Sequence, residues 1–539
     1  MATDASTAVF TYQTRLNVSP EQENALSALA ELFSRIERHL FVALQAGQSR
    51  NELKQTYQPR FGITARHYNS LYQSVTGKIS SLKELQPHHI GELTSKIASA
   101  RKQIAALSKK GNQQAAIHQK QRRLKHMERR LQQLKTDQSE GKLRLCFGSR
   151  RLFNQQFHLQ ENHFANHEQW LAAWRQARHN QFVMIGSKDE TAGNQSCQLM
   201  ANDDGTFALQ LRLPDALRQG DNKYFVLPNI TFKYGQPEIL AALASSQVIS
   251  SMNAQGVLTK KRTGTALSYR FLKDKTSWRL FVSITQSAPE QTTQRQAGAI
   301  GIDVNADHLA LAETDRFGNL LDAAKLPLVT YGKSTHQAQA LIGDVAKHIA
   351  LRAQAAGKPV VIEKLDFKRK KAELEDDNPK RARCLSCFAY SKILSCIKSA
   401  CFRAGVEVIE VNPAYTSVIG AIKYAQKKGI SVHMAAAFAI ARRGMRLSEL
   451  PPLRQVLVPT RNGDHVTFVL PVRDKAKHVW SHWSKLKTAL NTAHVAHFRR
   501  GDQLMAPPPL RSHPSLSAVW KSQVNRTQIC QECVLDIPF

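Results

Sequence analysis

The sequence predicts a multidomain α+β protein. The chain has 539 residues, too many for one hydrophobic core, because domains usually span about 50 to 250 residues. Apolar residues recur with a helical period early in the chain, alternate in the next part, and switch between the two patterns after residue 297. The expected parts are a strand at 1–18 that joins the following β-barrel, a helical lobe at 19–145, the β-barrel at 146–296, an α/β domain at 297–445 and a loosely folded basic extension at 446–539.

The charge of the chain predicts a polyanionic partner. Lysine and arginine number 75 against 42 acidic residues, which gives a formal net charge of +33. Such self-repulsion is most easily explained by nucleic acid that neutralises it. An anionic membrane surface is the alternative, but the sequence has no run of about 18 apolar residues and no signal-peptide pattern. We therefore expect no membrane partner and a cytoplasmic, nucleoid-associated protein.

Cysteine usage predicts neither disulfides nor zinc. The chain has eight cysteines, and without a secretory signal they should stay reduced. Two Cys-x-x-Cys pairs occur, Cys384/Cys387 and Cys530/Cys533, but more than 140 residues separate them. A zinc ribbon closes its two pairs over a few tens of residues, so a zinc site is not expected. The segment around the first pair has the pattern of a buried amphipathic helix.

The first 145 residues have strand and then helix signals. Alternation through Leu16 predicts a strand, and Ser19-Pro20-Glu21 predicts the start of a helix. Apolar residues at helical spacing over 92–137, with a turn near Gly111, predict an antiparallel helical hairpin. Its basic face at 120–130 is either a solvated surface or a surface that follows phosphates.

The next part of the chain has short alternating segments with turn signals. Hairpins are predicted with turns at Asp204-Gly205 and at Lys273-Asp274-Lys275, which indicates a small β-barrel or sandwich. Basic clusters beside aromatic residues suit contact with a nucleic-acid backbone and base stacking, although basic surface loops often bind nothing. The candidate contacts here are Arg150, Arg151, Lys260, Lys261 and Arg262.

From residue 298 strands and helices alternate. Three consecutive strands are expected, then a helix at 337–357, a strand at 358–367, a helix, a strand at 406–412 and a helix at 431–444. This is the element order of an RNase H-like α/β domain.

Two carboxylates end apolar strands of this domain. Asp303 ends the run "AIGID" and Glu363 ends "VVIE". An aspartate at a strand end can simply accept hydrogen bonds from local backbone. Two acids at strand ends of one sheet can instead face one crevice and hold divalent cations for phosphodiester hydrolysis.

Four segments carry a resemblance to a known family. In order, "IGIDVNADHLALAETDRFGN", "VVIEKLDF", "VIEVNPAYTS" and "SVHMAAAFAIARRG" resemble the split RuvC nuclease motifs of transposon-encoded TnpB proteins and type V CRISPR effectors. The resemblance implies a helical recognition lobe, a β-barrel wedge domain and a RuvC nuclease domain. It further implies an RNA-guided, Mg²⁺- or Mn²⁺-dependent DNA endonuclease with guide RNA and target double-stranded DNA as partners. Its oligomeric state is left open.

The third catalytic position departs from the family pattern. Asp303 and Glu363 match the first and second acids, but His433 stands where the family has the aspartate of an Asp-x-Asn-Ala-Ala helix, and the zinc ribbon that usually precedes this helix is missing. His433 could complete a metal site, because imidazole is a competent ligand. Alternatively the site is weakened, and the protein binds DNA under RNA guidance without cutting. A transposase or resolvase that works without RNA is a third reading.

A basic segment follows Glu363 directly. By analogy with the family it is well placed to touch the guide or the substrate strand, and the alternative is a solvated linker. The candidate residues are Lys368, Arg369, Lys370, Lys371, Arg381 and Arg383.

Overall fold

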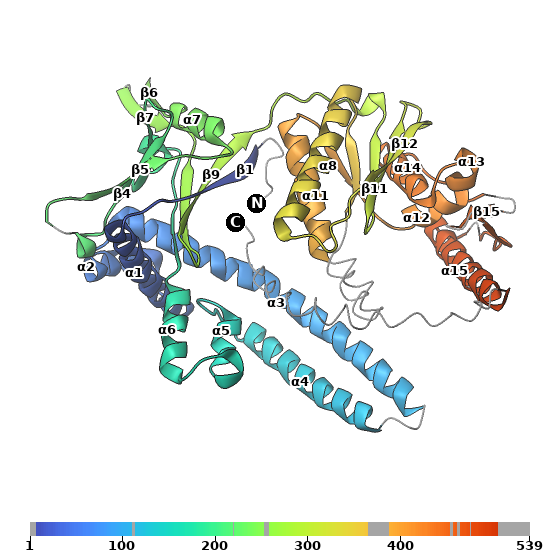
Figure 1. Cartoon of the computed structure of the whole chain (residues 1–539), viewed down its shortest axis with the longest axis horizontal. Coiled ribbons are helices and arrows are strands. Elements are labelled where there is room, and N and C mark those ends of the chain that lie inside the picture. The colour runs from blue at the N-terminus through green and yellow to red at the C-terminus, as the bar shows by residue number, and fades with distance from the viewer. Residues whose placement is uncertain are drawn as a thin grey trace, which may run out of the picture. The chain divides into compact units, whose positions relative to one another are not determined.

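The chain folds into two compact units, Met1–Ser287 and Ala288–Phe539, in a computed structural model (Figure 1). Both units contain helices and sheets, which confirms a multidomain α+β protein. No described helix is both long and apolar enough to span a membrane. The structure describes residues 7–109, 114–218, 220–252, 258–364, 387–452, 456–460, 464–474 and 476–504.

The first unit begins with a strand and a capped helix, as the sequence predicts. The Ser19 hydroxyl accepts a hydrogen bond from the Gln22 N–H, and the Gln22 side chain accepts one from the Ser19 N–H. This reciprocal cap fixes the start of α1. A long helix, α3, then pairs with α4 as the predicted hairpin. The helices here are α1 Pro20–Gln45, α2 Arg50–Phe61, α3 Ala65–Ser108 and α4 Gln114–Ser139.

The region expected to open the β-barrel is helical instead. Ser149 caps α5 through a hydrogen bond from the Leu152 N–H, and Trp170 and Trp174 of α6 are buried. Short helices and loops occupy this stretch, and the first strand after it begins at residue 181. The further helices of this unit are α5 Arg150–Gln155, α6 His167–Arg178 and α7 Gln236–Ala244.

The strands of the first unit form three separate sheets. The first has the order β1-β9-β8-β2, the second β3-β4-β5, and the third β6-β7. Both predicted hairpin turns are present, because Ala201 pairs with Phe207 and Lys273 pairs with Trp278. The strands are β1 Thr7–Arg15, β2 Gln181–Met184, β3 Cys197–Ala201, β4 Phe207–Arg212, β5 Tyr224–Ile230, β6 Gln247–Met252, β7 Leu258–Thr263, β8 Leu267–Lys273 and β9 Trp278–Ser287.

The first two sheets share one core, and the described strands do not close into a barrel. Leu209 of the second sheet and Phe271 of the first belong to one cluster of buried residues, together with Phe33 of α1. In the described residues no strand pairing joins the two sheets. The arrangement is therefore two separate sheets that pack, together with α1, on a common core.

The second unit is built on one five-stranded sheet with the order β12-β11-β10-β13-β14. The pairs β10–β11 and β11–β12 are antiparallel, whereas β10–β13 and β13–β14 are parallel. The strands are β10 Ile300–Val304, β11 His308–Thr314, β12 Leu320–Pro327, β13 Val360–Glu363 and β14 Val408–Val411.

Helices cover both faces of this sheet (Figure 1). Ile302 and Ile362 pack with Ile349 and Ile397 of α8 and α11 on one face. Ala310 lies in a separate cluster with α14 on the other face. Side chains alternate between the faces of a strand, so this separation follows directly from the sequence pattern. The order of three strands, helix, strand, helix, strand and helix is as predicted. The helices are α8 Thr335–Ala356, α11 Cys387–Arg403 and α14 Val432–Gly444.

Helix α14 lies unusually close to the sheet. A Cβ placed on Gly301 of β10 would lie 2.1 Å from the Ala437 carbonyl oxygen and 2.5 Å from the Ala441 nitrogen. Real Cβ atoms do not approach backbone so closely, so only glycine fits there. The alanines of α14 provide the complementary small surface. The close contact fixes the height of α14 above the strand that carries Asp303.

The C-terminal segment is folded where it is described, which corrects the expectation of a loose extension. Val458, Trp483 and Leu486 are buried in the same cluster as Phe438 of α14. The described pair Pro451-Pro452 lies in irregular backbone before β15 and does not prevent the elements that follow. This part of the chain contains α12 Thr416–Ile419, a π-helical turn Gly420–Ala425, α13 Gln426–Lys428, β15 Val456–Pro459, β16 His465–Phe468 and α15 Val479–Leu504.

Candidate active site

The two predicted carboxylates end neighbouring parallel strands. Gly301 of β10 pairs with Val361 of β13, and Asp303 and Glu363 each lie two residues further along. Because alternate residues of a strand share a face, both acids lie on the face of the sheet that α14 covers. Parallel strands bring their carboxyl ends to one edge. The strand ends therefore place the two acids side by side at the same level.

Helix α14 brings His433 to the same place. The Ser431 hydroxyl caps this helix by accepting a hydrogen bond from the Met434 N–H. His433 lies in the first turn, and its Nδ1 is 3.4 Å from Oδ2 of Asp303. The contact between the glycine of β10 and α14 makes this approach possible.

All three residues line one pocket of about 900 Å³ within the second unit. This volume lies in the usual range of ligand sites. Asp303 is mostly buried, with 9% of its surface exposed, and His433 is half-buried. The structure thus brings together Asp303, Glu363 and His433, which are far apart in sequence.

Two polar neighbours whose roles the sequence did not reveal hold the carboxylates. The Asn305 amide donates a hydrogen bond to Oδ2 of Asp303 at 3.0 Å. The buried Thr416 hydroxyl donates one to Oε1 of Glu363 at 2.5 Å. Hydrogen bonds to charged groups are stronger than neutral ones and fix the rotamers of the acids. Asn305 stands in the segment that begins "IGIDVN" and Thr416 in "VIEVNPAYTS". Both segments carry the family resemblance, and this was the sequence signal for the two positions.

The loop that presents Thr416 has an unusual backbone. Tyr415 has φ 63°, in the left-handed region that non-glycine residues rarely adopt. The Arg443 guanidinium donates hydrogen bonds to the carbonyl oxygens of Asn412 and Ala414 in the same loop. Burial lowers the pKa of Arg443, and the nearby Glu363 opposes this effect. Backbone strain of this kind persists where surrounding contacts enforce it. Here it turns the threonine hydroxyl toward Glu363.

A second histidine supports His433 from the sheet. The His308 side chain is buried, and its ring packs edge-on against the ring of His433 with 5.1 Å between centroids. Its Nδ1 lies 2.6 Å from Oδ1 of Asp307. This hydrogen bond lowers the pKa of the Asp307 carboxyl. His308 lies on the same face of β11 as its buried alanines. In the sequence it therefore resembles a core residue, and only the packing of α14 on this face reveals its contact with His433.

The donor set suits a divalent cation in kind. Two carboxylates supply the hard oxygens that Mg²⁺ prefers, and imidazole suits Mn²⁺ and other transition metals better. In the described part of the chain, however, no group of three histidine, cysteine or acidic side chains lies close enough to hold a metal ion. The hydrogen bonds from Asn305 and Thr416 each use one lone pair of one carboxylate oxygen, so both acids keep acceptor sites for a cation.

Only three of the candidate nucleic-acid contacts have described side chains. Arg150 and Arg151 are exposed in the first turn of α5. Arg262 donates a long hydrogen bond of 3.4 Å to the Ser246 hydroxyl. The backbone of Lys260 and Lys261 pairs with β6, and their side chains lie outside the described part. Lys368, Arg369, Lys370, Lys371, Arg381, Arg383 and the two Cys-x-x-Cys pairs also lie outside the described residues or side chains.

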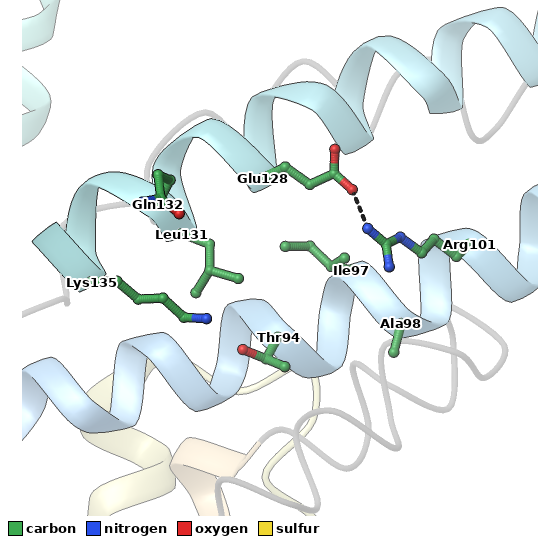
Figure 2. Close-up of a pocket in the computed structure, with 8 residues that line it drawn as sticks. All are labelled: Thr94, Ile97, Ala98, Arg101, Glu128, Leu131, Gln132 and Lys135. Atoms are coloured by element: carbon green, nitrogen blue, oxygen red, sulfur yellow. Dashed lines mark hydrogen bonds and ion pairs between the residues drawn. The ribbon is translucent and has the colours of Figure 1, made fainter.

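A smaller cavity of about 430 Å³ lies between α3 and α4 in the first unit (Figure 2). Arg101 and Glu128 form an ion pair of 2.6 Å across the two helices. Ile97 and Leu131 face one another beside it. This lining is typical of a helix–helix contact and has no set of converging catalytic groups.

Comparisons with known proteins give little further information. No protein-family model matches the chain, and no curated protein matches it. Among solved structures, T. thermophilus RuvC in complex with a Holliday junction substrate is similar over 26% of this chain and 88% of its own, with 20% identity and a TM-score of 0.20. A Cas12f1–sgRNA–target DNA complex is similar over 36% of this chain and 64% of its own, with 15% identity and a TM-score of 0.21. TM-scores this low carry no weight, so the function proposed below rests on this chain's own residues and on the motif resemblance.

Proposed function

We propose that this protein is an RNA-guided DNA endonuclease whose second unit is an RNase H-like, RuvC-type nuclease domain. The observation that carries the proposal is the pocket into which Asp303 and Glu363 project from the ends of β10 and β13, with His433 entering from α14. Carboxylates on neighbouring parallel strands are what metal-dependent phosphodiester hydrolysis needs. The sheet order, with two antiparallel and two parallel pairings around β10, agrees with this domain type.

The residues of the pocket have separate roles in this proposal. Asp303 and Glu363 would hold Mg²⁺ or Mn²⁺, with His433 as a third ligand, and such an ion supplies Lewis-acid activation of water and phosphate. Asn305 orients Asp303, and Thr416 orients Glu363, through the hydrogen bonds described above. Such outer partners usually set the geometry of the ligands.

Guidance by RNA rests on the motif resemblance and on charge. With a net charge of +33, the protein suits a nucleic-acid duplex held by its backbone. In the resembled family, RNA pairing reads the target sequence and the protein recognises a short flanking motif. The helices of the first unit would then be the recognition lobe and its packed sheets the wedge domain.

A second candidate is an RNA-guided protein that binds DNA without cutting. It is favoured by the absence, in the described residues, of a three-ligand metal cluster. Histidine in place of a third carboxylate also removes one negative charge, which lowers the affinity for Mg²⁺.

Two measurements on the full-length protein test these proposals. RNA that copurifies with the protein is sequenced, and plasmids that carry the matching target are incubated with Mg²⁺, with Mn²⁺ or with EDTA. We expect a defined RNA and cleavage that requires the metal, and we expect Asp303→Asn to abolish cleavage while guided binding persists. Binding without cleavage in wild type supports the second candidate. Cleavage by protein that contains no defined RNA would rule out guidance.

A further inference from the structure

The pocket has a second wall made by the C-terminal segment. Besides Asp303, Glu363 and His433, the pocket is lined by Val458 and Pro459 of β15, Thr460, His465 of β16 and His494 of α15. Sequence reasoning assigned no role to this segment. The motif resemblance ends near residue 445, so it assigns none either.

This wall is attached to the elements that carry the site. Val458 and Leu490 lie in one hydrophobic cluster with Phe438 of α14. Trp483 donates a hydrogen bond from its indole nitrogen to the Glu449 carbonyl oxygen at 3.3 Å. The Glu449 carboxylate in turn accepts a hydrogen bond from Arg442 of α14 at 2.6 Å. Buried polar networks of this kind resist displacement. The wall is therefore attached to α14, the helix that carries His433.

The two walls differ in chemistry. Asp303 and Glu363 carry negative charge, whereas His465 and His494 of the C-terminal segment present imidazole rings to the same pocket. A phosphodiester bound in this pocket would meet both cation-binding oxygens and N–H donors. Burial lowers the pKa of His494, which favours its neutral form. A neutral imidazole still has one N–H that it can donate to a phosphate oxygen. In the described residues neither ring belongs to a group that could hold a metal ion.

We propose that His465 and His494 bind phosphate oxygens of the DNA strand on which the carboxylates act. The inference rests on the proposed nuclease function, because it assigns the substrate strand to this pocket. The C-terminal segment is then the part of the protein that holds the strand over the acidic residues.

The test measures binding without cleavage. Full-length protein in EDTA, at an ionic strength of about 0.15 M where exposed charges are screened, is titrated against fluorescein-labelled tetrathymidylate, and anisotropy reports binding. The double variant His465→Ala/His494→Ala should bind roughly 30-fold more weakly, as expected for two lost hydrogen bonds. The matched control is His336→Ala/His348→Ala, which changes two exposed histidines of α8 on the other face of the sheet. It should bind as wild type.

A second probe separates phosphate contact from misfolding. Tetrathymidylate with neutral methylphosphonate linkages lacks the charged oxygens. Wild type should therefore bind it more weakly than the charged probe, whereas the double variant should bind the two probes with similar affinity. His465→Gln/His494→Gln, which keeps N–H donors, should recover part of the affinity. Equal binding by wild type and the alanine variant, or an equal loss on the neutral probe for both, would overturn the inference.

The outcome is independent of whether the protein cuts DNA. If wild type cleaves plasmid with Mg²⁺ while the alanine variant binds tetrathymidylate normally, the phosphate contact is wrong and the nuclease proposal stands. If wild type never cleaves but the alanine variant loses binding, the contact stands and the nuclease proposal fails.

Discussion

Replacing Gly301 by alanine tests the close contact on which the candidate site depends. The new Cβ would lie 2.1 Å from the Ala437 carbonyl oxygen. Since real contacts begin near 3.0 Å, α14 must move away from β10 by about 1 Å. The backbone of Gly301 is already extended in a regular strand, so alanine meets no conformational penalty there and the clash alone decides the effect.

The displacement has two measurable consequences. Overpacking of this kind costs about 1 to 3 kcal/mol of the free energy of unfolding, which urea titration measures. Because α14 carries His433, whose Nδ1 lies 3.4 Å from Asp303, the same shift misplaces the site. A displacement of about 1 Å can lower a rate by roughly 10²-fold. Single-turnover cleavage of a matched target gives this rate.

Gly343→Ala is the matched control. Gly343 lies inside α8, and a Cβ added there meets nothing within 4 Å. Alanine in a helix interior should raise the free energy of unfolding by about 0.5 to 1 kcal/mol and leave cleavage unchanged. If Gly301→Ala is as stable and as active as wild type, α14 does not rest on β10 as described, and the geometry of the site is wrong.

Two further predictions concern a buried histidine and a hydroxyl. Burial lowers the pKa of His67 to about 4, so between pH 6.5 and 4 the unfolded chain binds a proton that the folded chain does not. The free energy of unfolding of the wild type should therefore fall by about 3 kcal/mol as the pH falls through this window. Urea titrations of His67→Gln should lack that loss. Thr416→Val removes the hydrogen bond to Glu363 and should lower the cleavage rate about 10-fold, which is the usual effect of removing a partner of a metal ligand. Guided DNA binding should not change. An unchanged cleavage rate would remove Thr416 from the site.

Local patterns predicted much of the second unit. The apolar runs that end in Asp303 and Glu363 are buried strands, and the switch of periodicity reproduces the order of strands and helices. Such patterns work because a strand buried on both faces needs continuous apolar residues.

The C-terminal segment was misread for a physical reason. Its prolines suggested a loose chain, although Val456 and Val458 alternate as a strand does and Trp483, Leu486 and Leu490 recur at helical spacing. Each of these elements is short or polar on most of its surface. Burial against α14 stabilises them, and no local pattern reveals that partner.

The sequence by itself determined which residues could carry chemistry: two carboxylates at strand ends, a histidine at a helix start and a large positive charge. Only the tertiary structure decided which side chains meet them. Asn305 and Thr416 became partners of the acids, His308 of His433, and the imidazoles of the C-terminal wall came to face the same pocket. The physical reason is that hydrogen bonds and pocket walls depend on distances of a few ångströms between segments far apart in the chain, which packing sets and periodicity does not encode.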